Sequence, residues 1–302
     1  MQLFFMISAF TLLSADKAGP VRAFCIRRFF RIAPLYYLGI VGYLLLHGMG
    51  PQFYAPHGVS GADVALNVLF LHGWEPVAAF AVVPGGWSIG CEAMFYLAFP
   101  WARSRIGTML RSAVFVGLTV GASVAATVAI SRVLHDPAGH SWSYLNPVSQ
   151  APSFALGILA FHCCQRLSGN ALAQRLAGYG IFFALVGLAA LAVASTTLTR
   201  FHLIADIPLF ALLVSVVLSA PGWLVNSVTA WIGRISYSIY IVHFALIDLI
   251  RPLCAHSPIM RELAFVIVLG ASITVAHLMH TVIEQPMIRL GRKLSADRPA
   301  GR

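Results

Sequence analysis

The sequence predicts an all-α, polytopic transmembrane helical bundle with about nine spans. Of its 302 residues, 59% are apolar and only 10% are charged. Soluble domains usually carry about 25% charged residues, so this chain has too few polar side chains to cover a water-facing surface. The apolar residues also gather in bounded runs of helical length, as in membrane-crossing helices. We therefore expect an integral, multi-pass membrane protein.

The apolar runs predict the spans in chain order. They cover residues 2–15, 33–48, 87–102, 108–130, 150–165, 179–198, 203–220, 228–250 and 262–284. Several runs are shorter than the roughly 20 residues that a crossing helix needs. The stretch 62–83 is broken by His72 and Pro76, so we expect a short helix followed by a re-entrant or surface loop there.

Basic residues are distributed unequally between the two sides that this map defines. One side holds 16 of the 20, namely Lys17, Arg22, Arg27, Arg28, Arg31, Arg103, Arg105, Arg111, Arg166, Arg175, Arg234, Arg289, Arg292, Lys293, Arg298 and Arg302. Lys and Arg accumulate on the cytoplasmic side of a membrane, so the C-terminus is expected to be cytoplasmic. We divide the chain into a transmembrane domain at 1–286 and a cytoplasmic basic tail at 287–302.

Other features argue against several classes of protein. The net charge of +10 does not indicate a nucleic-acid partner, because the basic residues sit between apolar runs rather than in one stripe. The cysteines show no zinc or redox spacing, and no Walker or dinucleotide motif occurs. His277 and His280 stand at i and i+3, but no carboxylate completes a metal set, so hydrogen bonding between helices is the preferred interpretation. No metal and no cofactor are expected.

Three arginines crowd the cytoplasmic entrance of the second expected span. They are Arg27, Arg28 and Arg31, followed by Pro34, which suits the first turn inside the membrane. One interpretation is a positive-inside anchor. The other is a docking site for an anionic cytoplasmic ligand, because guanidinium groups bind phosphates bidentately. We take Arg28 and Arg31 as candidate donor-binding residues.

Polar residues also mark the helix expected at 87–102. Ser88, Glu92 and Tyr96 follow Trp87 at i, i+4 and i+8, so they share one helical face. A carboxylate a turn inside an apolar helix is costly to keep charged, which suits it to proton transfer. The structural alternative is that Ser88 caps the helix and Glu92 pairs with an arginine. Glu92 and Ser88 are the candidate catalytic residues, and Trp87 and Tyr96 are candidate binding residues.

A polar stripe runs along the span expected at 228–250. Ser236, Tyr240 and His243 fall on one face, which should point to the bundle or to a cavity rather than to lipid. Helix packing is the preferred interpretation of His243, and it is also kept as a candidate binding residue. In the span expected at 108–130, Gly117 and Gly121 form a G-x-x-x-G pair that can seat a neighbouring helix.

Five stretches follow one another in an order that resembles a known family. They are Phe4-Phe5-Met6-Ile7-Ser8-Ala9-Phe10, Arg28-x-x-Arg31-Ile-x-Pro34-x-Tyr36, Trp87-Ser88-x-x-x-Glu92-x-x-Phe95-Tyr96, Ile232-Gly233-Arg234-Ile235-Ser236-Tyr237-Ser238-Ile239-Tyr240-x-x-His243 and Ile283-Glu284-Gln285-Pro286. The ordered set resembles the acyltransferase 3 family of integral membrane O-acyltransferases, and the likeness runs from end to end.

The resemblance implies an activity. Such proteins move an acyl group, here expected to be acetyl, from a cytoplasmic acyl-CoA to a hydroxyl, commonly on a cell-surface or lipid-linked carbohydrate. It also implies a bacterial inner membrane location. The arginines would bind the donor phosphates. Glu92 would orient a base or bind the acceptor hydroxyl.

Two departures accompany the resemblance. Ala9 stands where the family usually has Gly. The family's proposed catalytic histidine lies on a helix before the Phe4 stretch, and the odd number of expected crossings points to the same missing N-terminal helix, so the resemblance names no base. The alternative functions are an N-terminally truncated, non-catalytic relative and a membrane transporter, although no inverted repeat supports the transporter.

Overall fold

The described residues of the chain are mostly helical and contain no strand. The computed structural model describes residues 1–15, 19–51, 55–133, 142–194, 202–254 and 258–296. They divide into two compact units. The first comprises Met1–Ala18, Phe70–Ala79 and Trp87–Val225, and the second comprises Gly19–Leu69, Phe80–Gly86 and Asn226–Arg302. Each unit is described by itself below.

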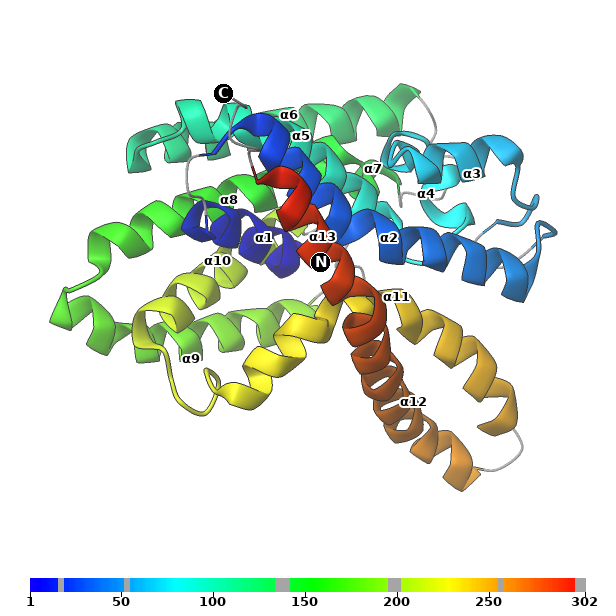
Figure 1. Ribbon diagram of the computed structural model, residues 1–302. Coiled ribbons are helices and arrows are strands. Elements are labelled where there is room, and N and C mark those ends of the chain that lie inside the picture. Colours follow the sequence, from blue (N-terminus) through cyan, green and yellow to red (C-terminus); the bar gives the residue numbers. More distant parts are fainter. Residues whose placement is uncertain (16–18, 52–54, 134–141, 195–201, 255–257, 297–302) are drawn as a thin grey trace, which may run out of the picture. The chain divides into compact units, whose positions relative to one another are not determined.

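The first unit is built around one central helix, α8. Its elements are α1 (Gln2–Ala15), η1 (His72–Trp74), α5 (Trp87–Arg105), α6 (Met109–Val133), α7 (Trp142–Leu145), α8 (Pro147–Leu167), α9 (Ala171–Ala194) and α10 (His202–Ser219), with α4 (Ala78–Ala81) at the unit boundary. Helix α8 packs against α1, α5, α6 and α10, and α9 packs along α10 (Figure 1). The start of α8 is fixed by Asn146, whose side chain accepts a hydrogen bond of 3.0 Å from the Ser149 amide.

Helices α1 and α8 approach each other closely at Gly157. A Cβ atom on Gly157 would lie only 2.8 Å from the Cβ of Ala9, and it would also meet the Met6 carbonyl. Helices can approach this closely only where one of them has a glycine at the contact. The glycine that this contact requires stands on α8, opposite Ala9 of α1. Gly117 and Gly121 behave differently, since a Cβ on either would meet no described atom within 4 Å. The expectation that they seat a neighbouring helix is wrong for the part of the chain that is described.

The second unit is built on α2. Its elements are α2 (Val21–His47), α3 (Gly61–Val68), α11 (Ser227–Cys254), α12 (Pro258–Met279), the π-helical turn η3 (His280–Glu284) and α13 (Gln285–Ser295). Helix α2 packs against α11 and α13, and α11 packs along α12. The Tyr237 hydroxyl of α11 donates to the Ile32 carbonyl of α2 over 2.8 Å. Helices α12 and α13 run on from one another through η3 (Figure 1).

Five helical segments are long and apolar enough to cross a membrane. They are Val21–His47, Met109–Arg132, Ala171–Val193, Ser227–Leu253 and Leu263–Ser295. Helices α1 and α10 are apolar but shorter. A helix occupies each of the nine expected segments, but the nine-span count is not confirmed. In the stretch 62–83, α3, η1 and α4 are all short, in agreement with a broken segment.

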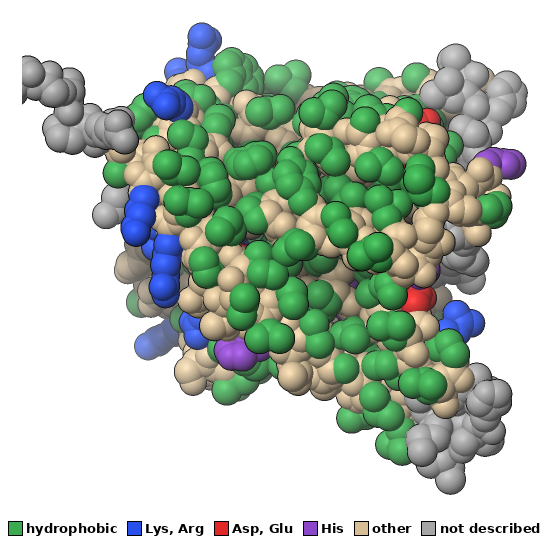
Figure 2. Space-filling view, turned by 45° about the vertical axis from the view of Figure 1, so that its right-hand side comes forward, with side chains coloured by type: hydrophobic (Ala, Val, Ile, Leu, Met, Phe, Trp, Pro, Cys, Tyr) green, Lys and Arg blue, Asp and Glu red, His purple; other side chains and the backbone are tan. Residues whose placement is uncertain are grey.

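The surface of the described residues is rich in large apolar side chains. Leu45 and Val193 are 83% and 89% exposed, and hydrophobic side chains are spread over the whole face in Figure 2. Apolar area of this extent is costly in water and favourable against lipid. The helices and this surface indicate an integral membrane protein.

Candidate functional site

The first polar group lies inside the first unit and is centred on Glu92 of α5. Its carboxylate is 4% exposed, and one oxygen, Oε1, accepts two hydrogen bonds. The Ser8 hydroxyl of α1 donates over 2.7 Å, and the Tyr96 hydroxyl donates over 2.6 Å. Two hydroxyl groups on one buried carboxylate oxygen satisfy part of the charge that burial would otherwise penalise. The site therefore shows Glu92 as an acceptor of hydroxyl hydrogen bonds.

The predicted face of α5 is buried as the spacing indicates. Ser88 is fully buried, and Trp87 contacts the Phe5 and Tyr144 rings, with centroids 6.1 and 5.8 Å away. Burial of Ser88, Glu92 and Tyr96 on one side follows from the helical period. Sequence reasoning missed Asp206 of α10, a second buried carboxylate in this unit. The Ser153 hydroxyl lies 3.0 and 3.1 Å from its two oxygens.

The second polar group is a pocket in the second unit that is rich in arginine. It has a volume of about 520 Å³ and is lined by Arg31, Ala230, Gly233, Arg234, His280, Glu284, Gln285, Ile288, Arg289 and Arg292. The four guanidinium groups come from α2, α11 and α13 and are exposed. Four cations around one cavity repel one another, and an anionic ligand relieves that repulsion. The pocket is therefore suited to bind several phosphate groups at once.

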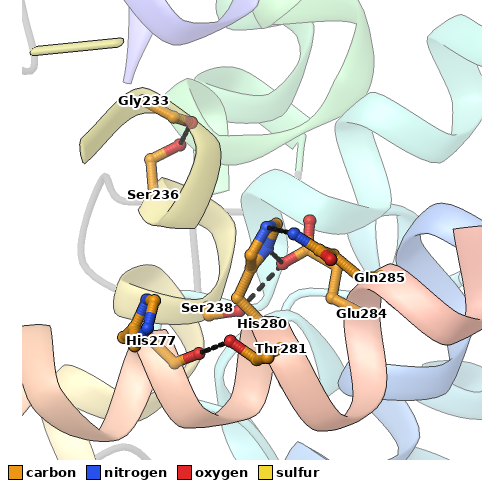
Figure 3. Close-up of polar contacts among 8 residues, drawn as sticks. All are labelled: Gly233, Ser236, Ser238, His277, His280, Thr281, Glu284 and Gln285. Atoms are coloured by element: carbon orange, nitrogen blue, oxygen red, sulfur yellow. Dashed lines mark hydrogen bonds and ion pairs between the residues drawn. The ribbon is translucent and has the colours of Figure 1, made fainter. Parts of the chain in front are cut away.

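Two residues that line the arginine pocket, His280 and Glu284, are hydrogen-bonded to each other, and Ser238 bonds the same carboxylate (Figure 3). The Glu284 carboxylate is 2% exposed, and its Oε2 lies 2.9 Å from Nδ1 of His280. The fully buried Ser238 hydroxyl of α11 donates to the same Oε2 over 2.8 Å. Because a carboxylate oxygen accepts, Nδ1 of His280 carries the hydrogen. The bond expected to tie this histidine to a neighbouring helix therefore runs through Glu284 to Ser238.

A further contact fixes the other nitrogen of the His280 ring. Gln285 Nε2 lies 3.2 Å from His280 Nε2, and Gln285 Oε1 accepts a hydrogen bond of 3.4 Å from Arg289. An arginine can only donate, so the amide oxygen faces Arg289 and the amide nitrogen faces the histidine. The His280 ring thus has its hydrogen on Nδ1, and its Nε2 accepts from the Gln285 amide (Figure 3).

The His243 side chain lines a separate groove between α11 and α12. This groove has a volume of about 880 Å³ and is lined by Ser236, Ile239, Tyr240, His243, Ile247, Arg251, Ala264, Phe265, Val268, Leu269 and Ser272. The polar stripe thus faces a cavity, as its position on the helix predicted. Nδ1 of His243 lies 2.8 Å from the Tyr240 carbonyl, so this nitrogen carries the hydrogen. It donates to a backbone oxygen of its own helix, α11.

The predicted site residues fall into three places. Arg31 lines the arginine pocket, whereas Arg28 is absent from its lining and places its guanidinium carbon 5.5 Å from the Phe24 ring centroid. His243 lines the groove. Trp87, Ser88, Glu92 and Tyr96 belong to the other unit. Sequence reasoning missed Ser238, His280 and Glu284 as one group, although the Ile283-Glu284-Gln285-Pro286 stretch signalled a special residue there.

Comparison with known proteins identifies the fold family. A family model described as an acyltransferase domain, Acyl_transf_3, matches residues 1–281. The chain belongs to the acyltransferase 3 family. It is similar to a protein named acyltransferase MdmB from Streptomyces mycarofaciens, with 27% identity over an alignment of 331 residues that covers 96% of this chain and 81% of that protein. No solved structure matches the chain.

Membership of the acyltransferase 3 family agrees with the resemblance carried by the five stretches. It supports acyl transfer as the reaction, so the protein is an acyltransferase that moves groups other than aminoacyl groups. Four of the stretches meet one another in pairs. Ser8 bonds Glu92 in one unit, and Ser238 bonds Glu284 in the other. Among the described residues, no three His, Cys, Asp or Glu side chains form a metal-binding group.

Proposed function

We propose that this membrane acyltransferase moves an acyl group, acetyl in the simplest case, from a cytoplasmic acyl-CoA to a hydroxyl of a carbohydrate. The arginine pocket carries this proposal. Its four guanidinium groups line one cavity with a single carboxylate, Glu284, which is already hydrogen-bonded. CoA presents several phosphates, and bidentate guanidinium contacts suit them.

The same arginines support a proposed orientation in the membrane. Arg31 stands in the N-terminal part of α2, and Arg289 and Arg292 stand on α13. We propose that this end of the second unit faces the cytoplasm of a bacterial inner membrane, with the C-terminus on the same side. In this proposal all nine helices in the expected segments cross the bilayer. The transmembrane domain then covers 1–286, and the tail 287–302 adds basic residues on the donor side.

Glu92 and Ser88 remain the proposed catalytic residues of the first unit, with Trp87 and Tyr96 as proposed binding residues. The bonds that Glu92 accepts from two hydroxyl groups support a role in holding a hydroxyl of the acceptor. The groove with Tyr240 and His243 supports an acceptor that has an apolar part, such as a lipid-linked sugar, because its lining is mostly aliphatic and aromatic.

A transfer assay tests the proposed function. The full chain, purified in lipid nanodiscs, is incubated with acetyl-CoA labelled in the acetyl group and with a panel of glycolipids and free sugars. The proposal predicts label in an ester that hydroxylamine removes, together with one free CoA thiol for each ester formed. Label in a hydroxylamine-stable amide, or acetyl-CoA left intact with every acceptor, would contradict it.

A further inference from the structure

We propose that a second basic pocket of the second unit binds the headgroup of an anionic phospholipid from the surrounding membrane. This pocket lies between the start of α2 and the end of α13, and we call it the α2–α13 pocket. It has a volume of about 550 Å³ and is lined by Pro20, Arg22, Ala23, Ile26, Lys293, Leu294, Ser295 and Ala296. Lipid binding there goes beyond the proposed acyl transfer and does not depend on it.

Two cations from different helices border the α2–α13 pocket. Arg22 stands on the first turn of α2 and Lys293 near the end of α13, and both residues are exposed. Neither side chain has a hydrogen bond or an ion pair with a described residue, and none of the described lining residues is acidic. Two such cations at one cavity favour an anion, and the oxygens of a single phosphate group can accept from both of them.

Close packing of α13 on α2 holds the two sides of this pocket together. A Cβ atom on Gly291 of α13 would lie only 2.6 Å from the Cβ of Phe30 of α2, so the two helices touch at this glycine. Lys293 follows Gly291 by two residues, and Arg22 precedes Phe30 by about two helical turns. The two cations are therefore fixed on opposite sides of one cavity and do not have to be gathered by the ligand.

The length of α2 places the α2–α13 pocket at the level of the lipid headgroups. Helix α2 has 27 residues, and its length is therefore about 40 Å, at about 1.5 Å per residue. The hydrocarbon core of a bilayer is about 30 Å thick, and the headgroup regions extend this to about 40–45 Å. When α2 crosses the membrane, Arg22 on its first turn lies among the headgroups, where the phosphates of the lipids are. Lys293 lines the same cavity and reaches the same level.

An apolar face of α13 leads from this pocket toward the hydrocarbon core. Leu294 lines the pocket, and Leu290 and Met287 stand four and seven residues before it, so the three side chains share one face of the helix. Leu290 and Leu294 are 38% and 54% exposed. Exposed leucines beside two cations fit an amphiphile, whose acyl chains lie along the leucines while its phosphate contacts the cations. A soluble phosphate compound would leave the apolar face uncovered, so we assign the pocket to a lipid.

Lipid binding to the full chain in mild detergent tests the assignment. Native mass spectrometry measures the dissociation constants of phosphatidylglycerol, which is anionic, and of phosphatidylcholine, which has no net charge. A basic side chain near an anionic lipid contributes about 5-fold in affinity, so Arg22→Gln combined with Lys293→Gln should weaken phosphatidylglycerol binding about 10-fold or more. Binding of phosphatidylcholine should stay within about 2-fold, because it depends little on these charges.

Arg166→Gln combined with Arg175→Gln is the matched control. It removes the same number of exposed charges from the expected cytoplasmic side, at residues that do not line the α2–α13 pocket, and it should leave phosphatidylglycerol binding within about 2-fold of wild type. Equal weakening by the two pairs of substitutions would indicate general attraction to a basic protein and overturn the proposal. Equal affinity of the wild-type protein for the two lipids would also overturn it, as would full displacement of phosphatidylglycerol by millimolar inorganic phosphate.

Photocrosslinking locates the lipid in the wild-type protein and does not depend on the folding of any variant. Phosphatidylglycerol with a diazirine close to its glycerol group is added to the chain in lipid nanodiscs, and mass spectrometry identifies the labelled peptides. We expect label in residues 22–26 and 293–296, about 5-fold or more above the label from a phosphatidylcholine probe with the same diazirine. Equal labelling of these residues by the two probes would contradict the proposal, as would no label in either segment.

Discussion

The Ser8 hydroxyl donates a hydrogen bond of 2.7 Å to Glu92 across a separation of 84 residues. This bond joins α1 to α5, and it joins two of the stretches on which the family resemblance was based. The same carboxylate oxygen also accepts from Tyr96, at 2.6 Å. A family motif in this unit is therefore completed by tertiary contact, and its parts should be tested together.

Substitution of Glu92 tests whether its carboxylate acts in the transfer reaction or only stabilises the fold. Glu92→Gln keeps the volume and an oxygen for Ser8 and Tyr96, but it removes the charge. We expect the transfer rate to fall by about 10²-fold or more, with membrane yield near that of wild type. Ser8→Ala removes one of the two bonds and should cost about 1 kcal/mol of stability with activity retained. A collapse of yield in Glu92→Gln would show that the carboxylate is structural.

The arginine pocket predicts different effects for two arginines of α2. Arg31 lines the pocket and Arg28 does not. A charge-assisted hydrogen bond contributes about 1.5–3 kcal/mol, so Arg31→Ala should raise KM for acetyl-CoA roughly 10- to 100-fold. Arg28→Ala should raise it far less. Arg175→Ala, an exposed arginine at the start of α9, is the control and should match wild type. Steady-state kinetics over a range of acetyl-CoA concentrations measures all three, and equal effects of Arg31→Ala and Arg175→Ala would refute the assignment.

The close contact of α1 and α8 predicts a strong size limit at Gly157. Gly157→Ala places a methyl group against Ala9 and the Met6 carbonyl, and such overpacking usually costs about 1–3 kcal/mol. Gly121→Ala, with open space around it, should be neutral or slightly stabilising because alanine favours the helix. Thermal unfolding of the two variants in the same detergent compares them. Equal unfolding temperatures would show that the two helices do not pack as closely as described.

The proposed orientation predicts which positions react with impermeant thiol reagents. Single cysteines are placed at Met49, after the end of α2, and at Ala296, after the end of α13, in a background with the native cysteines replaced. Both positions are exposed. In intact cells Met49→Cys should react, and Ala296→Cys should react only after the membrane is permeabilised. The opposite pattern would show that the topology is inverted, and the arginine pocket could then not bind a cytoplasmic donor.

Periodicity predicted the local part of the site well. Ser88, Glu92 and Tyr96 were assigned to one buried face because residues four apart on a helix must stack. The same reasoning aligned Ser236, Tyr240 and His243, which line one groove. The positions of the long helices followed from the apolar runs for a similar reason, since composition alone marks a segment that prefers lipid.

Contacts between residues on different helices could not be predicted from the sequence. Nothing in the spacing of His280 indicates that α11 brings Ser238 to the same oxygen of the Glu284 carboxylate. Nor does it indicate that a π-helical turn joins His280 and Glu284. The pairing of His280 with His277 as possible metal ligands assumed a regular α-helix. Arg234, Arg289 and Arg292 were assigned only to the basic side of the membrane, because the packing that gathers them with Arg31 involves three helices distant in sequence.

Equilibrium binding of acetyl-CoA to the full chain tests the central claim most directly. The account predicts saturable binding by the wild-type protein that weakens steeply with salt, because several phosphates are held by guanidinium groups. It also predicts that Arg31→Ala combined with Arg234→Ala weakens binding by about 100-fold or more, while Arg175→Ala leaves it unchanged. An affinity that is the same in the double variant and in wild type would contradict the account.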